Sequence, residues 1–462
     1  MRKKLLNNLL YVFVAQGAVL LLSLVLNLIV PKVIGKIEFG YWQFFLLLTN
    51  YVGFFTFGFS DGYYLKEGGK TTEELDFEKI GGELKVFILT QFLVSIFIFT
   101  SSFFLDDKKL LVQIIAIYLF FQNLSNFFGF VFQAQGAFKK YSFSVIIDKI
   151  FFLICFGSMM FFRTTTYIPF IIFYTCGKAV SVFYCVLNGR EFLRYRKFDI
   201  KNSLKDTLST TSIGANIMIS NILNSLIIGG GRFVIEQKWG IKAFGEVSLS
   251  FSFTFFFLMF VTQIGTVLFP LIKKLDSTNI DRFFISIKSK LDILLPMILI
   301  LYYPLELFLS IWLPQYSSSI RYLIILLPLC LYEGKFHMLY LVFYKALRYE
   351  RKLLLVNVSS FVLSIFLCIM CAYLFKSLNL VLVSLIFTIA LRSLFSEHIF
   401  SKKISNLEEF VELALVLVFI ISNWFLDKNI ASAIFGIAFI GYFMFNRMKL
   451  RTALIEFKIL KL

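Results

Sequence analysis

The feature that most constrains the fold of this chain is a series of apolar stretches, each about 20 residues long, separated by short polar connections. A helix that crosses the hydrocarbon core of a bilayer needs a stretch of about this length. Hydrophobic residues make up 59% of the 462 residues and charged residues 16%, whereas a soluble domain carries about 25% charged residues. The sequence therefore predicts an all-α polytopic membrane protein and excludes soluble, disordered and disulfide-scaffold classes.

Fourteen stretches fit the template of a membrane-spanning helix. They are 9–30, 39–60, 84–105, 110–132, 141–162, 167–187, 207–229, 243–269, 290–312, 321–344, 353–375, 378–399 and a less regular pair, 408–426 and 430–446. Twelve spans is the alternative count, if the last pair does not cross. The longest connection on the outer side is expected at 230–242, which is too short for an extramembrane catalytic domain. We therefore expect a protein that is not an enzyme.

The distribution of basic residues predicts the orientation. Of the 46 Lys and Arg, 30 fall in segments on one side of the predicted spans, 11 on the other, and the rest within spans. Cytoplasmic loops carry the excess of basic residues in membrane proteins, so both termini are expected in the cytoplasm. The net charge of +18 does not predict a nucleic-acid partner, because the bases lie in short runs between apolar blocks, where anionic membrane lipids are the expected partners.

Two short patterns of the first half recur in the second half. Gly35, Phe39 and Gly40 have the spacing of Gly240, Phe244 and Gly245, 205 residues later. Ala134 with Lys139 and Lys140 corresponds to Ala346 with Arg351 and Lys352, 212 residues later. The recurrence predicts two six-helix bundles of the same orientation, a parallel pseudo-repeat. The expected domains are 1–200 and 201–403, followed by an additional helix pair and cytoplasmic tail at 404–462.

Charged residues within the predicted spans are candidates for function, because a charge at the bilayer centre costs about 2.5–3.5 kcal/mol. Four bases lie about 10–14 Å from the predicted inner ends of their helices: Lys149, Lys178, Lys335 and Arg392. Asp148, Glu333 and His337 share this zone. One interpretation is a basic inner vestibule that binds a phosphate or diphosphate. The alternative is that the long basic side chains reach toward the inner headgroups, with no specific ligand.

Uncharged polar residues form two further candidate surfaces. Gln16 and Asn27 share one face of the first span with Ser23, and the seventh span carries Asn216, Ser220 and Asn224 at helical spacing. Arg232 corresponds to Asn27 in the repeat. These faces are expected to line or gate a cavity, although such residues also hold membrane helices together by hydrogen bonds. The spacing of His and Cys residues predicts no metal site and no cofactor.

Several motifs together resemble bacterial oligosaccharide-lipid flippases of the Wzx or polysaccharide-transporter type, within the MATE-like MOP superfamily. The motifs are Ile34–Gly35 with Glu38–Trp42, Gly58–Gly62, Gln133–Gly136 with Lys139–Ser142, Gly231–Arg232, Phe244–Gly245 and Phe269–Pro270. In this resemblance Asp61 is similar to the acidic residue that ends the second helix in these families. Asp61, together with Asp148, Glu333 and His337, is expected to line or gate a cavity. Asn27 departs from relatives that have a basic residue in the first helix.

The resemblance implies a pair of six-helix bundles that moves an undecaprenyl-diphosphate-linked oligosaccharide, such as an O-antigen or capsule unit, from the inner to the outer leaflet by alternating access. It implies residence in the bacterial cytoplasmic membrane, a proton or sodium ion as coupling ion, and other polysaccharide assembly proteins as partners. A MATE drug exporter and a lipid II flippase are alternatives with the same fold. A membrane polysaccharide polymerase is a further alternative, but such enzymes usually have a large outer loop.

Overall fold

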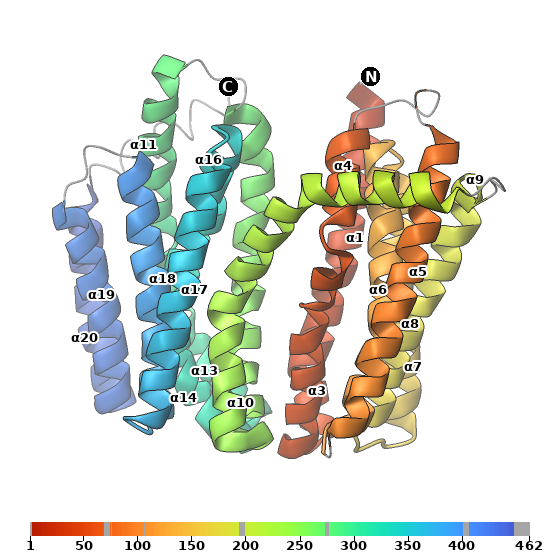
Figure 1. Cartoon of the computed structure of the whole chain (residues 1–462). Coiled ribbons are helices and arrows are strands. Elements are labelled where there is room, and N and C mark those ends of the chain that lie inside the picture. Colours follow the sequence, from red (N-terminus) through yellow and green to blue (C-terminus); the bar gives the residue numbers. More distant parts are fainter. Residues whose placement is uncertain are drawn as a thin grey trace. The chain divides into compact units, whose positions relative to one another are not determined.

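The computed structural model describes residues 2–68, 74, 76–105, 107–193, 199–272, 277–400 and 406–447, and all regular structure in these ranges is helical (Figure 1). Within this part of the chain, ten helices are long and apolar enough to cross a bilayer, or eleven if the bent pair Pro314–Leu326 and Leu329–Ala346 forms one span. A multi-pass helical membrane protein is therefore confirmed. Most residues of every predicted span lie in helices, although the span 39–60 is interrupted between Thr49 and Phe59, and the count of fourteen crossings stays a prediction.

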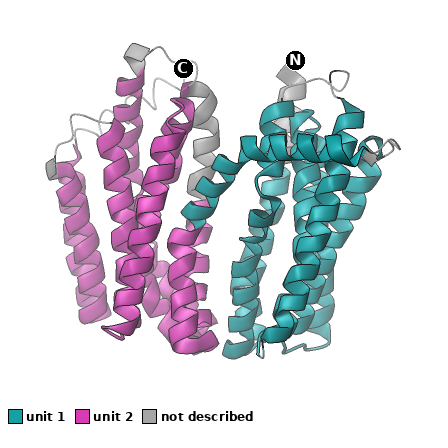
Figure 2. Cartoon of the chain, viewed as in Figure 1, with its two compact units in different colours: residues 1–225 teal, residues 226–462 magenta. Residues whose placement is uncertain are grey.

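The chain divides into two compact units, Met1–Ser225 and Leu226–Leu462 (Figure 2). The main helices of the first unit are α1 (Arg2–Leu28), α3 (Lys36–Thr49), α4 (Phe59–Glu67), α5 (Phe77–Ser101), α6 (Lys109–Ala134), α7 (Phe138–Phe161), α8 (Ile168–Asn188) and the start of α10 (Ile200–Ile272). The short helices α2 (Val30–Val33) and α9 (Arg190–Leu193) and a 3₁₀ turn, η1 (Val52–Thr56), join them. The predicted domains 1–200, 201–403 and 404–462 stay a prediction.

The second unit contains the rest of α10 and the helices that follow it. These are α11 (Ser277–Leu294), α12 (Met297–Ile300), α13 (Tyr302–Trp312), α14 (Ser317–Leu326), α15 (Leu329–Lys335), α16 (Leu341–Ala346), α17 (Glu350–Tyr373), α18 (Leu378–Phe400), α19 (Asn406–Phe425) and α20 (Lys428–Phe445). A π-helical turn, Phe336–Tyr340, joins α15 to α16. Such turns widen a helix locally and occur often at functional sites.

The connection expected at 230–242 is helical, so that expectation is wrong. α10 continues through this range and breaks only at Gly240, whose φ of 77° lies in the region that glycine adopts without a steric penalty. The glycine-rich, basic sequence resembles a loop, but Arg232 is only 6% exposed and its guanidinium lies 5.3 Å from the Phe244 ring centroid. Aromatic rings and a serine hydroxyl thus surround the guanidinium, so this cation lies in a helical, buried segment instead of a solvated loop.

The first part of α10 runs across α4 and α5 rather than along them (Figure 1). Residues 200–240 would extend about 60 Å as one helix, twice the thickness of a bilayer core of about 30 Å. Lys79 of α5 and Asp206 of α10 form an ion pair of 2.9 Å, and Lys66 of α4 donates to Thr210 of α10 at 2.9 Å. The predicted span 207–229 therefore begins within this transverse part.

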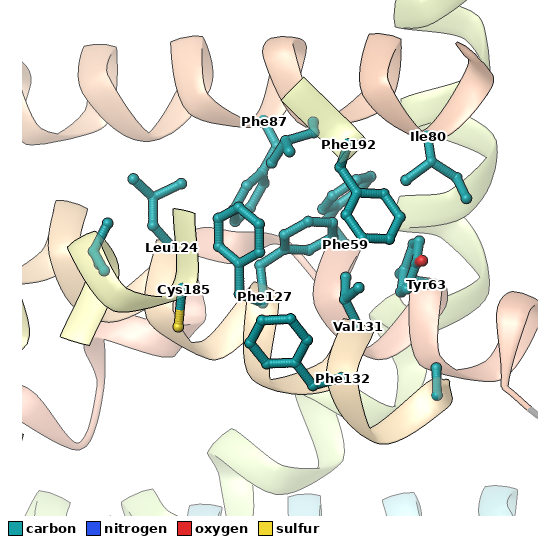
Figure 3. Close-up of a cluster of buried hydrophobic side chains, with 14 residues drawn as sticks. Phe59, Tyr63, Ile80, Phe87, Leu124, Phe127, Val131, Phe132, Cys185 and Phe192 are labelled. Carbon is teal, nitrogen blue, oxygen red and sulfur yellow. The ribbon is translucent and has the colours of Figure 1, made fainter. Parts of the chain in front are cut away.

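Aromatic side chains build the core of the first unit (Figure 3). Phe59 of α4 stacks on Phe87 of α5 with ring centroids 4.8 Å apart and on Phe127 of α6 at 5.4 Å. Lipid tails are as apolar as these rings, so close packing rather than exclusion of water holds such helices together. This core fixes the position of α4, and with it the break between α3 and α4.

The predicted repeat is also visible in the backbone conformation of the two units. α6 ends at Ala134 and α16 ends at Ala346, 212 residues later. Each end is followed by one residue of positive φ, Gly136 at 67° and Arg348 at 57°, and the next helices, α7 and α17, are both 24 residues long. α7 packs on α8 as α17 packs on α18, so the two units repeat the same helix pairing.

Candidate functional site

Two lysines share one buried carboxylate in the first unit. Lys149 follows Asp148 on α7, and its Nζ lies 2.8 Å from Asp148 Oδ2, while Nζ of Lys178 on α8 lies 2.6 Å from the same oxygen. The Lys149 ammonium also lies 5.5 Å from the ring centroid of Tyr174. All three charged side chains are nearly buried, so the group holds one more positive than negative charge away from water.

A small residue brings these charges together. Gly177 precedes Lys178, and a Cβ built on Gly177 would lie 2.9 Å from the Asp148 backbone oxygen, which is closer than side chains tolerate. α7 and α8 therefore approach at this point because there is no side chain between them. The sequence predicted all three residues at one depth, and the structure places them in one cluster.

The other two predicted bases lie in the second unit, and each is paired there. The guanidinium of Arg392 on α18 is fully buried, bonds to Glu333 of α15 and stacks 3.8 Å from the ring centroid of Phe336. His337 Nε2 lies 3.8 Å from the same carboxylate of Glu333. The predicted neighbours Glu333, His337 and Arg392 are thus brought together.

Lys335 belongs to a second ion-pair network of this unit. Its Nζ lies 2.7 Å from Asp292 of α11 and bonds to Glu412 of α19. Lys288 of α11 joins this network through Asp292 and lies 2.5 Å from Glu397 of α18. The network ties the additional pair α19 and α20 to the rest of the unit.

The buried ion pairs of this unit do not have the excess of bases that was expected for a basic vestibule. Lys288, Lys335 and Arg392 face four buried carboxylates, which are Asp292, Glu333, Glu397 and Glu412. Carboxylates thus outnumber bases in the described part of this cluster, whereas bases outnumber carboxylates in the Asp148 cluster. The sequence analysis named Glu333 among the neighbours of the bases but not Asp292, Glu397 or Glu412, because ion pairs between helices depend on helix rotation.

The residues of the predicted polar faces differ in burial, and their role in lining or gating a cavity stays a prediction. Asn27 is buried and donates to Ser23 on the same helix at 3.2 Å, whereas Gln16 is half-buried. On α10, Ser220 is buried, Asn224 is half-buried and Asn216 is exposed. Arg232, expected beside an outer loop, donates instead to Ser248 within the helical second unit.

Asp61 lines a pocket whose position and other lining residues the sequence analysis did not predict. The pocket lies at the break between α3 and α4 and has a volume of about 190 Å³. α6 contributes Asn126 and α10 contributes Asn221 and Ser225, which lie on a face next to the predicted one. The sequence contained a pattern that indicates this polar surface: Tyr118, Gln122 and Asn126 lie four residues apart and therefore share one face of α6.

A family model described as "Polysaccharide biosynthesis protein" matches residues 5–276, which is more than half of the chain. The chain belongs to the polysaccharide biosynthesis protein family. No curated protein is similar enough in sequence to count as a relative. Membership in this family confirms the predicted resemblance, including the motifs from Ile34 to Phe269 that lie within the matched range.

Solved structures with the same fold cover nearly the whole chain of this family member. The structure of "Lipid II flippase MurJ, inward closed conformation" has a TM-score of 0.68 at 14% identity and covers 96% of this chain and 100% of its own. An inward-facing MATE multidrug resistance transporter of the MOP superfamily has a TM-score of 0.64 at 11% identity, covering 86% and 96%. A variant of the Vibrio cholerae MATE transporter VcmN has a TM-score of 0.53 at 16% identity, covering 88% and 98%.

These similarities show the fold alone: the chain folds like a MATE transporter of the MOP superfamily and like the lipid II flippase MurJ, as the sequence predicted. Family and fold together indicate a transporter or flippase rather than an enzyme.

Proposed function

We propose that this protein is a flippase that moves an undecaprenyl-diphosphate-linked oligosaccharide from the cytoplasmic to the outer leaflet by alternating access. Membership in the polysaccharide biosynthesis family supports a lipid-linked glycan as the substrate class. O-antigen, lipopolysaccharide, capsule, exopolysaccharide and teichoic-type units are all glycans of the proposed class.

The cluster of Asp148, Lys149 and Lys178 supports the proposal that the protein binds the diphosphate head group of its lipid substrate. Two ammonium groups and one carboxylate leave one positive charge inside an apolar helix bundle. Ammonium groups donate to phosphate oxygens, and such charge-assisted hydrogen bonds are about twice as strong as neutral ones. A diphosphate that reaches this cluster would compensate the excess charge, and the surrounding helices would exclude water from the contact.

The proposal includes a location and a coupling mode. The protein is placed in the bacterial cytoplasmic membrane with both termini in the cytoplasm, because the basic connections lie on that side of the predicted spans. A proton or sodium gradient would drive the cycle without a bound cofactor. Membrane lipids and other polysaccharide assembly proteins would be its partners.

A leaflet-exchange assay in proteoliposomes tests the proposal. It compares a short glycan on undecaprenyl diphosphate with the same glycan on a phosphate-free undecaprenyl carrier. We expect faster protein-dependent movement of the diphosphate form. Equal movement of both forms, or no movement of either in folded protein supplied with proton and sodium gradients, would contradict it.

A MATE-type antiporter of cationic drugs is the second candidate, and the charge balance of the buried ion pairs in the second unit favours it. Four buried carboxylates face three bases there, which suits a cation better than an anion. Gradient-driven movement of ethidium, with no movement of either glycolipid, would select this candidate. A lipid II flippase would share the diphosphate contact and differ in the glycan that it accepts.

A further inference from the structure

The pocket at the break between α3 and α4 is built by residues of the first unit alone. α3 ends at Thr49, and α4 begins at Phe59 after two residues of positive φ, Phe57 at 54° and Gly58 at 89°. A Cβ on Gly62 would lie 1.9 Å from the Thr210 backbone oxygen, so the backbones of α4 and α10 touch here. The break and this contact leave a hollow above the first turn of α4.

The lining of this pocket combines a carboxylate, side-chain amides and an aromatic ring. Asp61 supplies a carboxylate, and Asn50, Asn126 and Asn221 supply side-chain amides that both donate and accept hydrogen bonds. Phe130 supplies an aromatic ring on the same pocket. The pocket therefore offers donors, acceptors and an apolar face together, and the part of its lining that the structure describes contains no basic side chain.

One buried group of the lining lacks a hydrogen-bond partner. Ser60 is only 2% exposed, and its Oγ has none among the residues that the structure describes. Buried hydroxyls are normally paired, but this oxygen is itself inaccessible and lies beneath the surface of the pocket. A ligand in the pocket would therefore contact its neighbour Asp61, in the first turn of α4, rather than the Ser60 hydroxyl.

A hydrogen-bonded series holds one amide of the pocket in place. Tyr118 donates to Gln122 Oε1 at 2.9 Å, and Gln122 Nε2 donates to Asn126 Oδ1 at 2.9 Å. Because its oxygen accepts from Gln122, Asn126 turns its NH₂ group outward as a donor. Pairs of amides and carboxylates with fixed orientation can bind adjacent hydroxyl groups.

The dimensions of the pocket select among ligands. Its volume of about 190 Å³ is more than ten times the ~15 Å³ of cavity that holds one water molecule, far more than a bare cation needs. A phosphate is disfavoured because Asp61 would repel it. A single sugar ring fits this size, with hydroxyls for the amides and a C–H face for Phe130.

We propose that this pocket is a sugar-recognition subsite, which binds one monosaccharide unit of the transported glycan through Asp61, Asn126 and Asn221. The inference rests on the proposed function for the origin of the sugar, and it places head-group binding and sugar binding at different residues. The Asp148 cluster binds the diphosphate, and the pocket selects the glycan by binding one of its sugar units.

A binding measurement tests the subsite independently of transport. Purified protein is heated with millimolar N-acetylglucosamine, glucose, galactose or rhamnose. A sugar that binds the folded state raises Tm by mass action, by about 2 °C if it exceeds its Kd tenfold. We expect at least one sugar to give this rise in the wild type and none in Asn126→Ala/Asn221→Ala. Ser212→Ala, an exposed change on the same helix α10, is the matched control and should keep the rise.

Three results would overturn the subsite. The first is a Tm that none of the four sugars raises, and the second is an equal sugar-dependent rise of Tm in the wild type and the double variant. The third is a Tm that is higher in sodium chloride than in choline chloride, loses this difference in Asp61→Asn, and does not respond to sugars. The last result would identify a cation site.

A transport measurement separates this inference from the proposed function. It compares undecaprenyl-diphosphate N-acetylglucosamine with undecaprenyl diphosphate in proteoliposomes. The double variant should reduce movement of the sugar-bearing lipid about tenfold and leave the sugar-free lipid unchanged, whereas equal loss of both would overturn the subsite. Sugar-dependent stabilisation without movement of either lipid would contradict the flippase and leave the subsite standing.

Discussion

Lys178 of α8 and Asp148 of α7 form a buried ion pair in which Nζ and Oδ2 lie 2.6 Å apart, and Lys149 shares the same oxygen. One carboxylate thus balances two ammonium groups. Removing the carboxylate and removing one lysine should therefore have different consequences.

Asp148→Asn should destabilise the protein by about 3–5 kcal/mol, because two buried cations lose their counter-ion. Lys178→Met leaves the Lys149–Asp148 pair intact, so its loss of stability should be smaller. It removes the excess charge, and movement of the diphosphate lipid should fall roughly tenfold, the value of one charge-assisted hydrogen bond. Thermal unfolding and leaflet exchange measure the two effects, with the exposed Lys242→Met as control. A Lys178→Met protein with full transport would contradict a role for the cluster in substrate binding.

Gly62→Ala should separate α4 from α10. The new Cβ would lie 1.9 Å from the Thr210 backbone oxygen, and two backbones cannot both yield without disturbing the aromatic core around Phe59. We expect a loss of about 1–3 kcal/mol, as for overpacked cores. Gly17→Ala in α1 meets no atom within 4 Å and should be neutral or slightly stabilising in the same unfolding experiment. Equal stability of the two variants would mean that α4 and α10 do not touch.

Lys335→Met should loosen the attachment of α19. It leaves Asp292 and Glu412 without their shared cation in a buried position, at a cost of about 3–5 kcal/mol. Lys428→Met breaks a more exposed pair with Glu306, at 2.9 Å, and should cost less than about 1 kcal/mol. The midpoints of thermal unfolding should therefore differ clearly. Similar midpoints would show that the Lys335 network does not contribute to stability.

A disulfide should form between α5 and the transverse part of α10 in Gly82→Cys/Ser203→Cys. A Cβ built on Gly82 lies 3.3 Å from the Ser203 Cβ, close to the ~3.8 Å typical of disulfides. Peptide mapping by mass spectrometry after mild oxidation should detect the linked peptides. Gly82→Cys/Ser212→Cys is the control and should stay reduced, because Ser212 lies nine residues beyond Ser203, about 13 Å farther along α10, out of reach of a disulfide. Absence of the first link would place α10 elsewhere.

Most of the fold follows from hydrophobicity along the chain. Most of each predicted span is helical because a backbone in lipid must satisfy its own hydrogen bonds, and a helix does so within one segment. The repeat was also readable, since Ala134 and Ala346 end corresponding helices. The segment 230–242 was misjudged because glycine and basic residues are typical of loops, whereas here Arg232 is buried against aromatic rings.

The sequence by itself determined which segments are helical and which polar residues lie within them, because both depend on local composition. Only the tertiary structure decided that Lys178 meets Asp148, that Lys335 meets Glu412, and that Asn126 and Asn221 line one pocket. The partners of these residues lie 30 to 95 positions away along the chain. Their meeting depends on the rotation and crossing of whole helices, which the packing of many side chains sets together.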